Sequence, residues 1–242
     1  MCTDGSDDLP LFSIITVVFN GERFIQNCIQ SVLAQTFTLY EYIVIDGGST
    51  DKTVEIIKSY EKQLSYWVSE PDSGIYHAMN KGLNRVNGRW IFFLGADDRF
   101  FDNEVLSRIS GILKDELDIV FGNIKYNSGD IVISKFSVKT LLHNTIHHQS
   151  AFYSRRNFLK WRYDQKFRLI SDYELNLKIY KKKGGYRYID TCIAICDQSG
   201  MSRSLLDIAF KETNEIRRRY HGVVQSWLLK VVYYIKFKIK NV

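Results

Sequence analysis

Two adjacent carboxylates, Asp97 and Asp98, directly follow a continuous apolar run at 90–94 and a small Gly95-Ala96 pair. An apolar run of this kind is typical of a strand that is buried on both faces of a parallel sheet. Ionised carboxylates at the end of such a strand are costly unless they face water, a cation or hydrogen-bond donors. Because ligands collect at the carboxyl ends of strands in open α/β sheets, the pair is suited to a divalent metal that holds an anionic ligand. A solvated turn that caps the next helix explains the same residues about equally well.

Another carboxylate, Asp46, ends the apolar run at 40–45 and precedes a glycine turn at 47–51. A carboxylate in this position can accept hydrogen bonds from a base or a ribose, and a helix start nearby favours anions. The alternative is that Asp46 is a turn residue and that the hydroxyl and carboxylate side chains of the turn only cap a helix. No G-x-G-x-x-G pattern occurs here, so a dinucleotide-binding fold is not indicated.

The stretch 70–82 is unusually rich in polar groups for its length, with Asp72, Asn80 and Lys81 beside a loop that contains Gly74. Its apolar residues recur at helical spacing after the loop, which predicts that a helix follows. Taken alone, Lys81 fits an ordinary surface charge.

Apolar periodicity predicts alternating strands and helices along the first hundred residues. The expected strands are 12–18, 40–45, 66–68 and the run that begins at Trp90, and the expected helices lie around 24–33 and 53–60. We expect Asn20 to cap the first helix. This alternation favours a doubly wound parallel sheet with right-handed crossovers.

The second half of the chain has a less regular pattern. Strands are expected at 118–121, 131–133 and 151–153, and a helix from about Asp172 to the glycine pair at 184–185. A mixed sheet with an antiparallel portion accommodates these elements best.

Composition fits a folded protein of ordinary polarity, with 45% hydrophobic and 25% charged residues. The formal net charge is +6, and eight basic against three acidic residues follow Leu205, so the rest of the chain is close to neutral. A near-neutral body argues against a broad nucleic-acid footprint. Four scattered cysteines form neither a zinc pattern nor a disulfide framework, which favours a reducing cytoplasm. The absence of a signal peptide and of a spanning apolar run predicts a soluble or membrane-associated protein.

Seven segments, in this order and spacing, resemble family 2 glycosyltransferases of the GT-A fold: 14–20, 45–51, 70–76, 80–82, 95–98, 148–152 and 171–175. The last two are similar to acceptor-side segments of the branch that builds polysaccharides. The resemblance extends from Phe12 to Ser202. It implies a Rossmann-like, mostly parallel α/β sheet with a mixed C-terminal portion and C-terminal amphipathic helices. The implied organisation is a flexible N-terminus at 1–11, a GT-A domain at 12–204 (nucleotide-binding half 12–100, acceptor half 101–204) and a basic helical tail at 205–242.

The resemblance also implies a role for each site residue. Asp98 matches a direct ligand of Mn²⁺ or Mg²⁺, and Asp172 matches the general base. More weakly, His148 and Gln149 match contacts to the donor phosphate or the acceptor. The positions that match nucleotide-sugar contacts are Val18, Phe19, Asn20, Asp46, Gly47, Asp72, Gly74, Asn80 and Asp97.

The chain departs from the family pattern at several points. His77 stands where many relatives carry Asp, the metal motif lacks the Asp-x-Asp form, and the Gln-x-x-Arg-Trp signature of processive members is absent. The last departure favours the addition of a single sugar. His143, His147 and His148 suggest zinc only weakly, because no fourth ligand is fixed beside them.

The activity implied is inverting, metal-dependent transfer of a sugar from a nucleotide diphosphate, with UDP-sugar favoured, to a saccharide or lipid-linked saccharide in surface polysaccharide assembly. A cation neutralises the leaving diphosphate, and a carboxylate takes the proton of the attacking hydroxyl. The alternatives are a non-catalytic, membrane-associated scaffold of the same fold and transfer to a lipid monophosphate.

An apolar stripe in the tail, from Val224 to Ile235, has lysines off its face. Such a helix suits the surface of an anionic membrane, which predicts a cytoplasmic protein at the inner face of the cell membrane. Packing of this helix on the body or on another subunit is the alternative.

Overall fold

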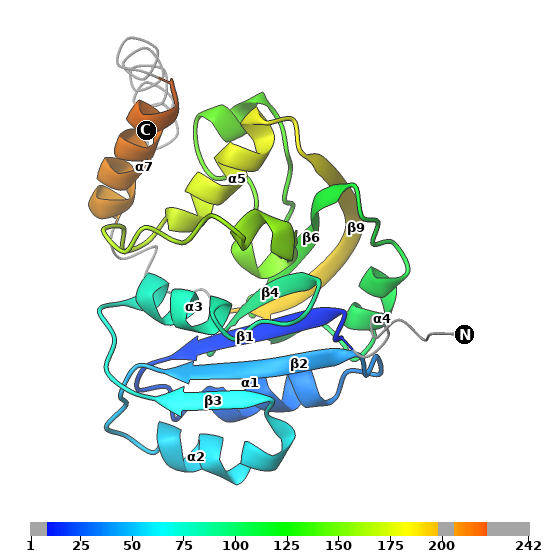
Figure 1. Cartoon of the computed structure of the whole chain (residues 1–242), viewed down its shortest axis with the longest axis vertical. Coiled ribbons are helices and arrows are strands. Elements are labelled where there is room, and N and C mark those ends of the chain that lie inside the picture. The colour runs from blue at the N-terminus through cyan, green and yellow to red at the C-terminus, as the bar shows by residue number, and fades with distance from the viewer. Residues whose placement is uncertain (1–8, 198–205, 222–242) are drawn as a thin grey trace.

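The computed structural model describes residues 9–197 and 206–221, in which one nine-stranded sheet carries helices on both faces (Figure 1). The strand order is β3-β2-β1-β4-β8-β6-β9-β5, and β7 pairs with β6 outside this path. The strands are β1 (Phe12–Val18), β2 (Tyr40–Asp46), β3 (Tyr66–Ser69), β4 (Trp90–Gly95), β5 (Arg99–Phe100), β6 (Leu117–Tyr126), β7 (Ile131–Val132), β8 (Ala151–Ser154) and β9 (Gly185–Cys196).

The first four strands form the parallel part of the sheet, as the sequence predicted. They are connected through α1 (Ile25–Leu33), α2 (Thr53–Ser59) and α3 (Ile75–Leu83). Because the strands are parallel, their carboxyl ends and the polar turns that follow lie at one edge of the sheet.

The rest of the sheet is mixed. β8 is antiparallel to both β4 and β6, whereas β9 is parallel to β6. The predicted helix is α5 (Ser171–Lys181), which ends before the glycine pair as expected. Among the described strands and α-helices, three were not predicted: β9, β5 and α4 (Val105–Ser110). β9 lacked a strand pattern because its first half is largely polar and exposed and its pairing with β6 is irregular.

Alternate side chains of the central strands point to two separate apolar layers. One layer, which includes Ile14, is covered by α1, α2 and α4. The other, which includes Ile15, is covered by α3, α5 and α7 (Leu206–His221). Full burial of each large aliphatic side chain contributes roughly 1.5–3 kcal/mol to the stability of the fold. The two apolar layers therefore hold the strands in place, and with them the edge of the sheet where the polar turns lie.

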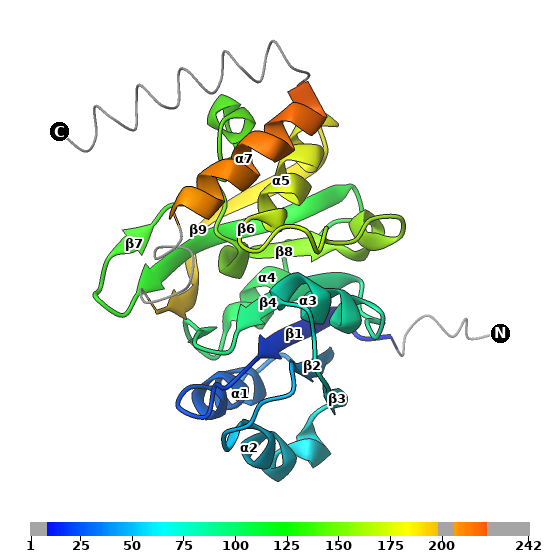
Figure 2. The same cartoon turned by 90° about the vertical axis from the view of Figure 1, so that its left-hand side faces the viewer.

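The helix α7 lies along α5 in both views and belongs to the body (Figures 1 and 2). Its Ile216 side chain is fully buried in the layer beneath α5. The apolar stripe predicted from Val224 to Ile235 lies outside the described residues. Among the helices described, none combines the length and the apolar character needed to cross a membrane.

Candidate active site

The loops after β1 and β2 are tied to each other by hydrogen bonds. The Gly47 amide donates to the Val18 carbonyl at 2.9 Å, and the Asn20 amide donates to the Ser49 hydroxyl at 2.7 Å. The Asn20 side chain does not cap α1: its Oδ1 accepts the Thr50 amide at 2.9 Å, and Asn20 itself adopts a positive φ of 50°. The cap prediction was therefore wrong, because Asn20 turns toward the neighbouring loop.

Two predicted nucleotide-binding residues in these loops differ sharply in exposure. Phe19 is 63% exposed, so its ring is available to a ligand. The Asp46 carboxylate is fully buried and accepts hydrogen bonds from the Gly48 amide, from Ser49 and from the Ser69 hydroxyl at 2.6 Å. In this structure Asp46 orders the turn, and its contact to a base or a ribose stays a prediction.

The loop at 72–74 closes over the same turn. Gly47 makes room for the Asp72 carboxylate, since a Cβ at Gly47 would collide with it. Asp72 in turn accepts a hydrogen bond from the Gly74 amide at 2.8 Å. Gly74 has a backbone φ of 124°, which residues other than glycine rarely adopt. His77 accepts the Ser73 amide at 3.0 Å through Nδ1, so it helps to close this loop.

Asn80 faces the acceptor half of the chain. Its side-chain amide donates to the Tyr163 carbonyl at 2.8 Å and accepts the Tyr163 amide at 3.0 Å. A hollow of about 730 Å³ lies beside this pair, with Ser73, Asn84 and residues 162–166 on its walls. Asn80 therefore joins the helix after the Asp72 loop to the acceptor-side segment, and direct binding of the donor by Asn80 remains a prediction.

Asp97, Asp98 and Gln149 gather around Gly95, where a Cβ would approach all three side chains. The Asp98 carboxylate is 4% exposed and accepts the Gln149 amide at 2.6 Å and the Asp197 backbone amide at 3.2 Å. The sequence thus placed the pair correctly at the end of β4. The partner Gln149 comes from a loop 51 residues away.

Burial, together with the neighbouring charge of Asp97, raises the pKa of Asp98 to about 7. Burial also raises the pKa of Asp97. A divalent cation bound here would remove this cost, and carboxylate oxygens are the ligands that Mg²⁺ and Mn²⁺ prefer. The Gln149 side-chain oxygen is buried without a hydrogen-bond partner, so one more oxygen acceptor stands beside the pair. The donor set fits a hard cation whose remaining ligands come from its substrate.

The histidines near this pair do not form a metal centre. The His147 and His148 rings stack with centroids 5.4 Å apart, and burial lowers their pKa values to about 4 and about 3. Both are therefore neutral near pH 7. Across residues 9–197 and 206–221, no three His, Cys, Asp or Glu side chains are grouped to hold a metal by themselves.

Asp172 lies in the first turn of α5 and is 6% exposed. Its carboxylate accepts the Asn144 side-chain amide at 2.6 Å, and Asn144 is held in turn by Asn176 at 3.0 Å. The hydroxyl of Tyr76, from α3, accepts the Ser171 amide at 2.8 Å. Burial raises the pKa of Asp172 to about 6, which is a suitable value for a base that works near neutral pH.

One loop serves both carboxylates, since Asn144 contacts Asp172 and Gln149 contacts Asp98. The sequence interpretation missed Asn144 and Tyr76. Tyr76 lies within the segment 70–76 that resembles the family, whereas Asn144 has no local sequence signal because its partner is 28 residues away.

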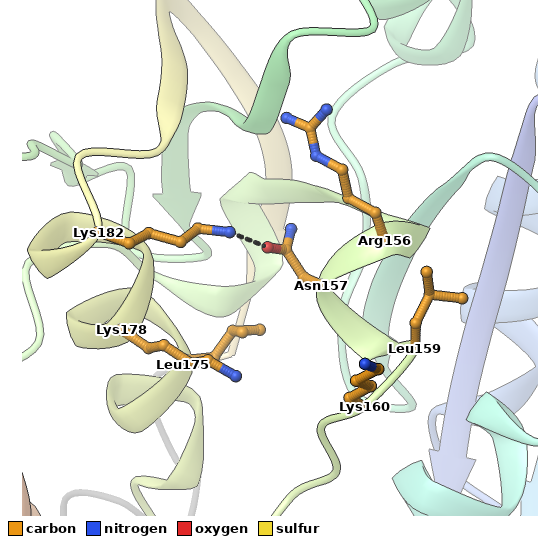
Figure 3. A pocket seen from close by; sticks show the side chains of 7 residues that line it. All are labelled: Arg156, Asn157, Leu159, Lys160, Leu175, Lys178 and Lys182. Carbon is orange, nitrogen blue, oxygen red and sulfur yellow. Dashed lines mark hydrogen bonds between the residues drawn. The ribbon is translucent and has the colours of Figure 1, made fainter.

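A separate basic hollow of about 210 Å³ lies between α5 and the short helical turn η4 (Arg155–Phe158) (Figure 3). Arg156 and Lys182 are both paired with Asp118, and Lys182 also donates to Asn157 at 3.0 Å. None of the predicted site residues lines this hollow. The candidate site residues therefore lie apart from this hollow.

Comparison with known proteins gives a consistent assignment. The family model described as "Glycosyl transferase family 2" matches residues 13–209. A relative from Mycobacterium bovis, named a PGL/p-HBAD biosynthesis glycosyltransferase, is 29% identical over 211 residues, which cover 83% of this chain and 82% of that protein.

Solved structures share the fold. S. aureus TarS 1–349 in complex with UDP-GlcNAc matches with a TM-score of 0.69 at 19% identity, over 85% of this chain and 64% of TarS 1–349. The mannosyltransferase PcManGT from Pyrobaculum calidifontis, in complex with GDP-Man and Mn²⁺, matches with a TM-score of 0.61 at 18% identity, over 92% of this chain and 64% of its own. The chain thus spans just under two thirds of the length of these structures.

Proposed function

Because the chain belongs to glycosyl transferase family 2, we propose that it transfers a sugar from a nucleotide diphosphate donor, with inversion, to a saccharide or lipid-linked saccharide. A UDP-sugar is the favoured donor, in line with the UDP-GlcNAc that is bound to TarS. The M. bovis relative, named for PGL/p-HBAD biosynthesis, supports an acceptor from surface glycan or glycolipid assembly.

The observation that carries this proposal is the pair of buried carboxylate sites served by one loop. Asp98 and Asp172 are each less than a tenth exposed, and both have raised pKa values. Raised pKa values of buried carboxylates in a polar cluster are typical of functional sites. Ion pairs do not explain either residue, since no salt bridge to Asp98 or Asp172 occurs in the described part of the chain.

Asp172 is the proposed general base. The acceptor hydroxyl must lose its proton as it attacks the sugar carbon, and a positioned carboxylate takes that proton. Asn144 holds one Asp172 oxygen at 2.6 Å, which orients the carboxylate. A base on the side of the sugar opposite the leaving diphosphate gives in-line displacement, and hence inversion at that carbon.

Asp98 is the proposed ligand for Mn²⁺ or Mg²⁺, with Asp97 beside it. A cation held by Asp98 would supply positive charge for the leaving diphosphate, as a Lewis acid does at a phosphoryl oxygen. Residues 1–154 contain 19 acidic and 13 basic residues, so this part of the chain has no net positive charge to offset the charge of the donor. Gln149 keeps one Asp98 oxygen in place and presents its own side-chain oxygen next to it.

Calorimetry with UDP-, GDP- and dTDP-sugars, each with and without Mn²⁺, tests the proposal. We expect one nucleotide class to bind and its affinity to depend on the cation. Failure of every donor to bind in the presence of Mn²⁺ would contradict the enzymatic proposal and favour a scaffold that keeps only the fold.

A further inference from the structure

Glu212, on α7, holds three consecutive backbone amides that directly precede α5. Its carboxylate accepts the Arg168 amide at 2.6 Å, the Leu169 amide at 3.0 Å and the Ile170 amide at 3.2 Å. Glu212 is 8% exposed, and the three donors lie 42 to 44 residues before it in the chain. Hydrogen bonds from amides to a charged carboxylate are about twice as strong as neutral ones.

The amides held by Glu212 end two residues before the proposed base. Ile170 is the residue that precedes α5, Ser171 donates its amide to the Tyr76 hydroxyl, and Asp172 follows. The backbone conformation at 168–170 therefore sets where α5 begins and where the Asp172 carboxylate lies. Small displacements of a reacting group are costly, since a shift of about 1 Å can lower a rate by about 100-fold.

No basic side chain within residues 9–197 and 206–221 forms an ion pair with Glu212. Its charge is stabilised by the three amides, and both of its oxygens are used. A carboxamide at this position offers only one acceptor oxygen and turns an NH₂ group toward a donor. Glu212→Gln is therefore a nearly isosteric change that removes at least one of the three hydrogen bonds from the 168–170 amides.

Arg219, two turns further along α7, anchors the flanks of the same segment. Its guanidinium pairs with Asp164 at 2.8 Å and with Glu174 at 3.4 Å, and it lies 4.7 Å from the centroid of the Phe167 ring. Glu212 and Arg219 both come from α7, so this helix fixes the segment 164–174 from outside the nucleotide-binding half. Neither residue was singled out by its sequence pattern.

We propose that Glu212 is a positioning residue for the sugar-transfer reaction, which fixes the 168–170 backbone so that the Asp172 carboxylate stays buried and correctly directed. This inference rests on the proposed function, because it assigns Glu212 a role through the base. The helix α7 would then determine the position of the Asp172 carboxylate.

The test compares Glu212→Gln with Asp207→Asn in the full-length chain. Asp207 is an exposed carboxylate on the same helix, so its variant matches the loss of one negative charge. NMR titration of the Asp172 carboxyl should give a pKa near 6 in the wild type and in Asp207→Asn. The pKa should be lower by about one unit or more in Glu212→Gln, because the displaced carboxylate becomes accessible to solvent. The turnover number of Glu212→Gln should fall about 10- to 100-fold while donor affinity stays within about twofold.

An unmoved Asp172 pKa in folded Glu212→Gln overturns the inference, whether or not the protein transfers sugar. A loss of turnover that only follows the folded fraction, with an unchanged pH profile, also overturns it and makes Glu212 a structural residue. If Glu212→Gln does not fold, Glu212→Asp decides, because it keeps both acceptor oxygens on a shorter side chain and should shift the pKa in the same direction. A failure of the proposed function would be recognised separately, because the wild-type protein would then bind no nucleotide sugar.

Discussion

Asp98 and Asp172 are both buried carboxylates with raised pKa values, but the chain fixes them in different ways. The position of Asp98 follows from the strand before it: β4 ends at Gly95, and the Asp98 amide donates back to the Gly95 carbonyl at 3.0 Å. Asp172 depends on Asn144, on Tyr76 from α3 and on the segment that Glu212 of α7 holds. The proposed metal side is thus positioned first by the parallel sheet, with Gln149 and the Asp197 amide added from distant parts of the chain. The proposed base side depends on packing between distant elements throughout.

The two carboxylates also lie in parts of the chain that differ in net charge. Residues 1–154 carry an excess of acidic residues, whereas residues 155–183 contain ten basic and three acidic residues. The comparison therefore predicts that changes on the metal side alter donor binding and that changes on the base side alter turnover.

The largest effect is expected for Asp172→Asn. The substitution keeps the shape of the side chain but cannot take a proton, so turnover should fall about 10²- to 10⁴-fold, or roughly 3–5 kcal/mol of barrier. Donor affinity by calorimetry and the melting temperature should change little. A loss of turnover below about tenfold would assign Asp172 to helix capping, which is worth about 0.3–1 kcal/mol. The neighbouring Glu174 is a poor replacement base, because it faces Arg219 at 3.4 Å.

Asp98→Ala should abolish the Mn²⁺ dependence of donor binding and lower donor affinity by at least about tenfold, since a cation ligand is removed. The fold should survive, because removal of a carboxylate whose pKa is about 7 relieves a burial cost. Circular dichroism and calorimetry on the same sample provide the measurement. Near-normal turnover of this variant with Mn²⁺ supplied would exclude Asp98 as the metal ligand.

The pH dependence of turnover should separate the two carboxylates. Asp172 must be ionised to act as a base, and its pKa is raised to about 6, so turnover at saturating donor and Mn²⁺ should rise with pH through about 6 and then level off. At pH 5 this predicts a loss of about tenfold. If Asp98 binds Mn²⁺, protons and Mn²⁺ compete for its carboxylate. A higher Mn²⁺ concentration should then restore donor binding at low pH without shifting the pH at which Asp172 ionises. A turnover number that does not change between pH 5 and pH 8 would contradict the assignment of Asp172 as the general base.

The smallest effect on the site is expected from truncation after Tyr220. The remaining part of α7 keeps Glu212 and Ile216, so turnover with a water-soluble acceptor should stay within about twofold. Binding to vesicles that contain anionic lipid should be lost, because the basic apolar stripe of the tail is removed. Vesicle binding that persists, or a body that unfolds, would assign the tail a structural role.

The fold and the position of the carboxylate pair were predictable because their sequence signals are local. The parallel strands, the helix after the Asp72 loop and the carboxylate pair after β4 each follow from a short pattern. What the sequence did not indicate depends on distant partners: Asn20 turns to Thr50, Asn144 reaches Asp172 and Glu212 holds 168–170. β9 was missed because its pairing with β6, and not an apolar pattern, makes it a strand.

Donor titration of Asp98→Ala and Asp172→Asn, side by side with the wild type in Mn²⁺, tests the division between the two carboxylates most directly. We expect Asp172→Asn to bind the nucleotide sugar with wild-type affinity and Asp98→Ala to bind at least about tenfold more weakly, with no response to the cation. Equal affinities in all three proteins, or a loss of binding confined to Asp172→Asn, would contradict the assignment of the metal to the end of β4.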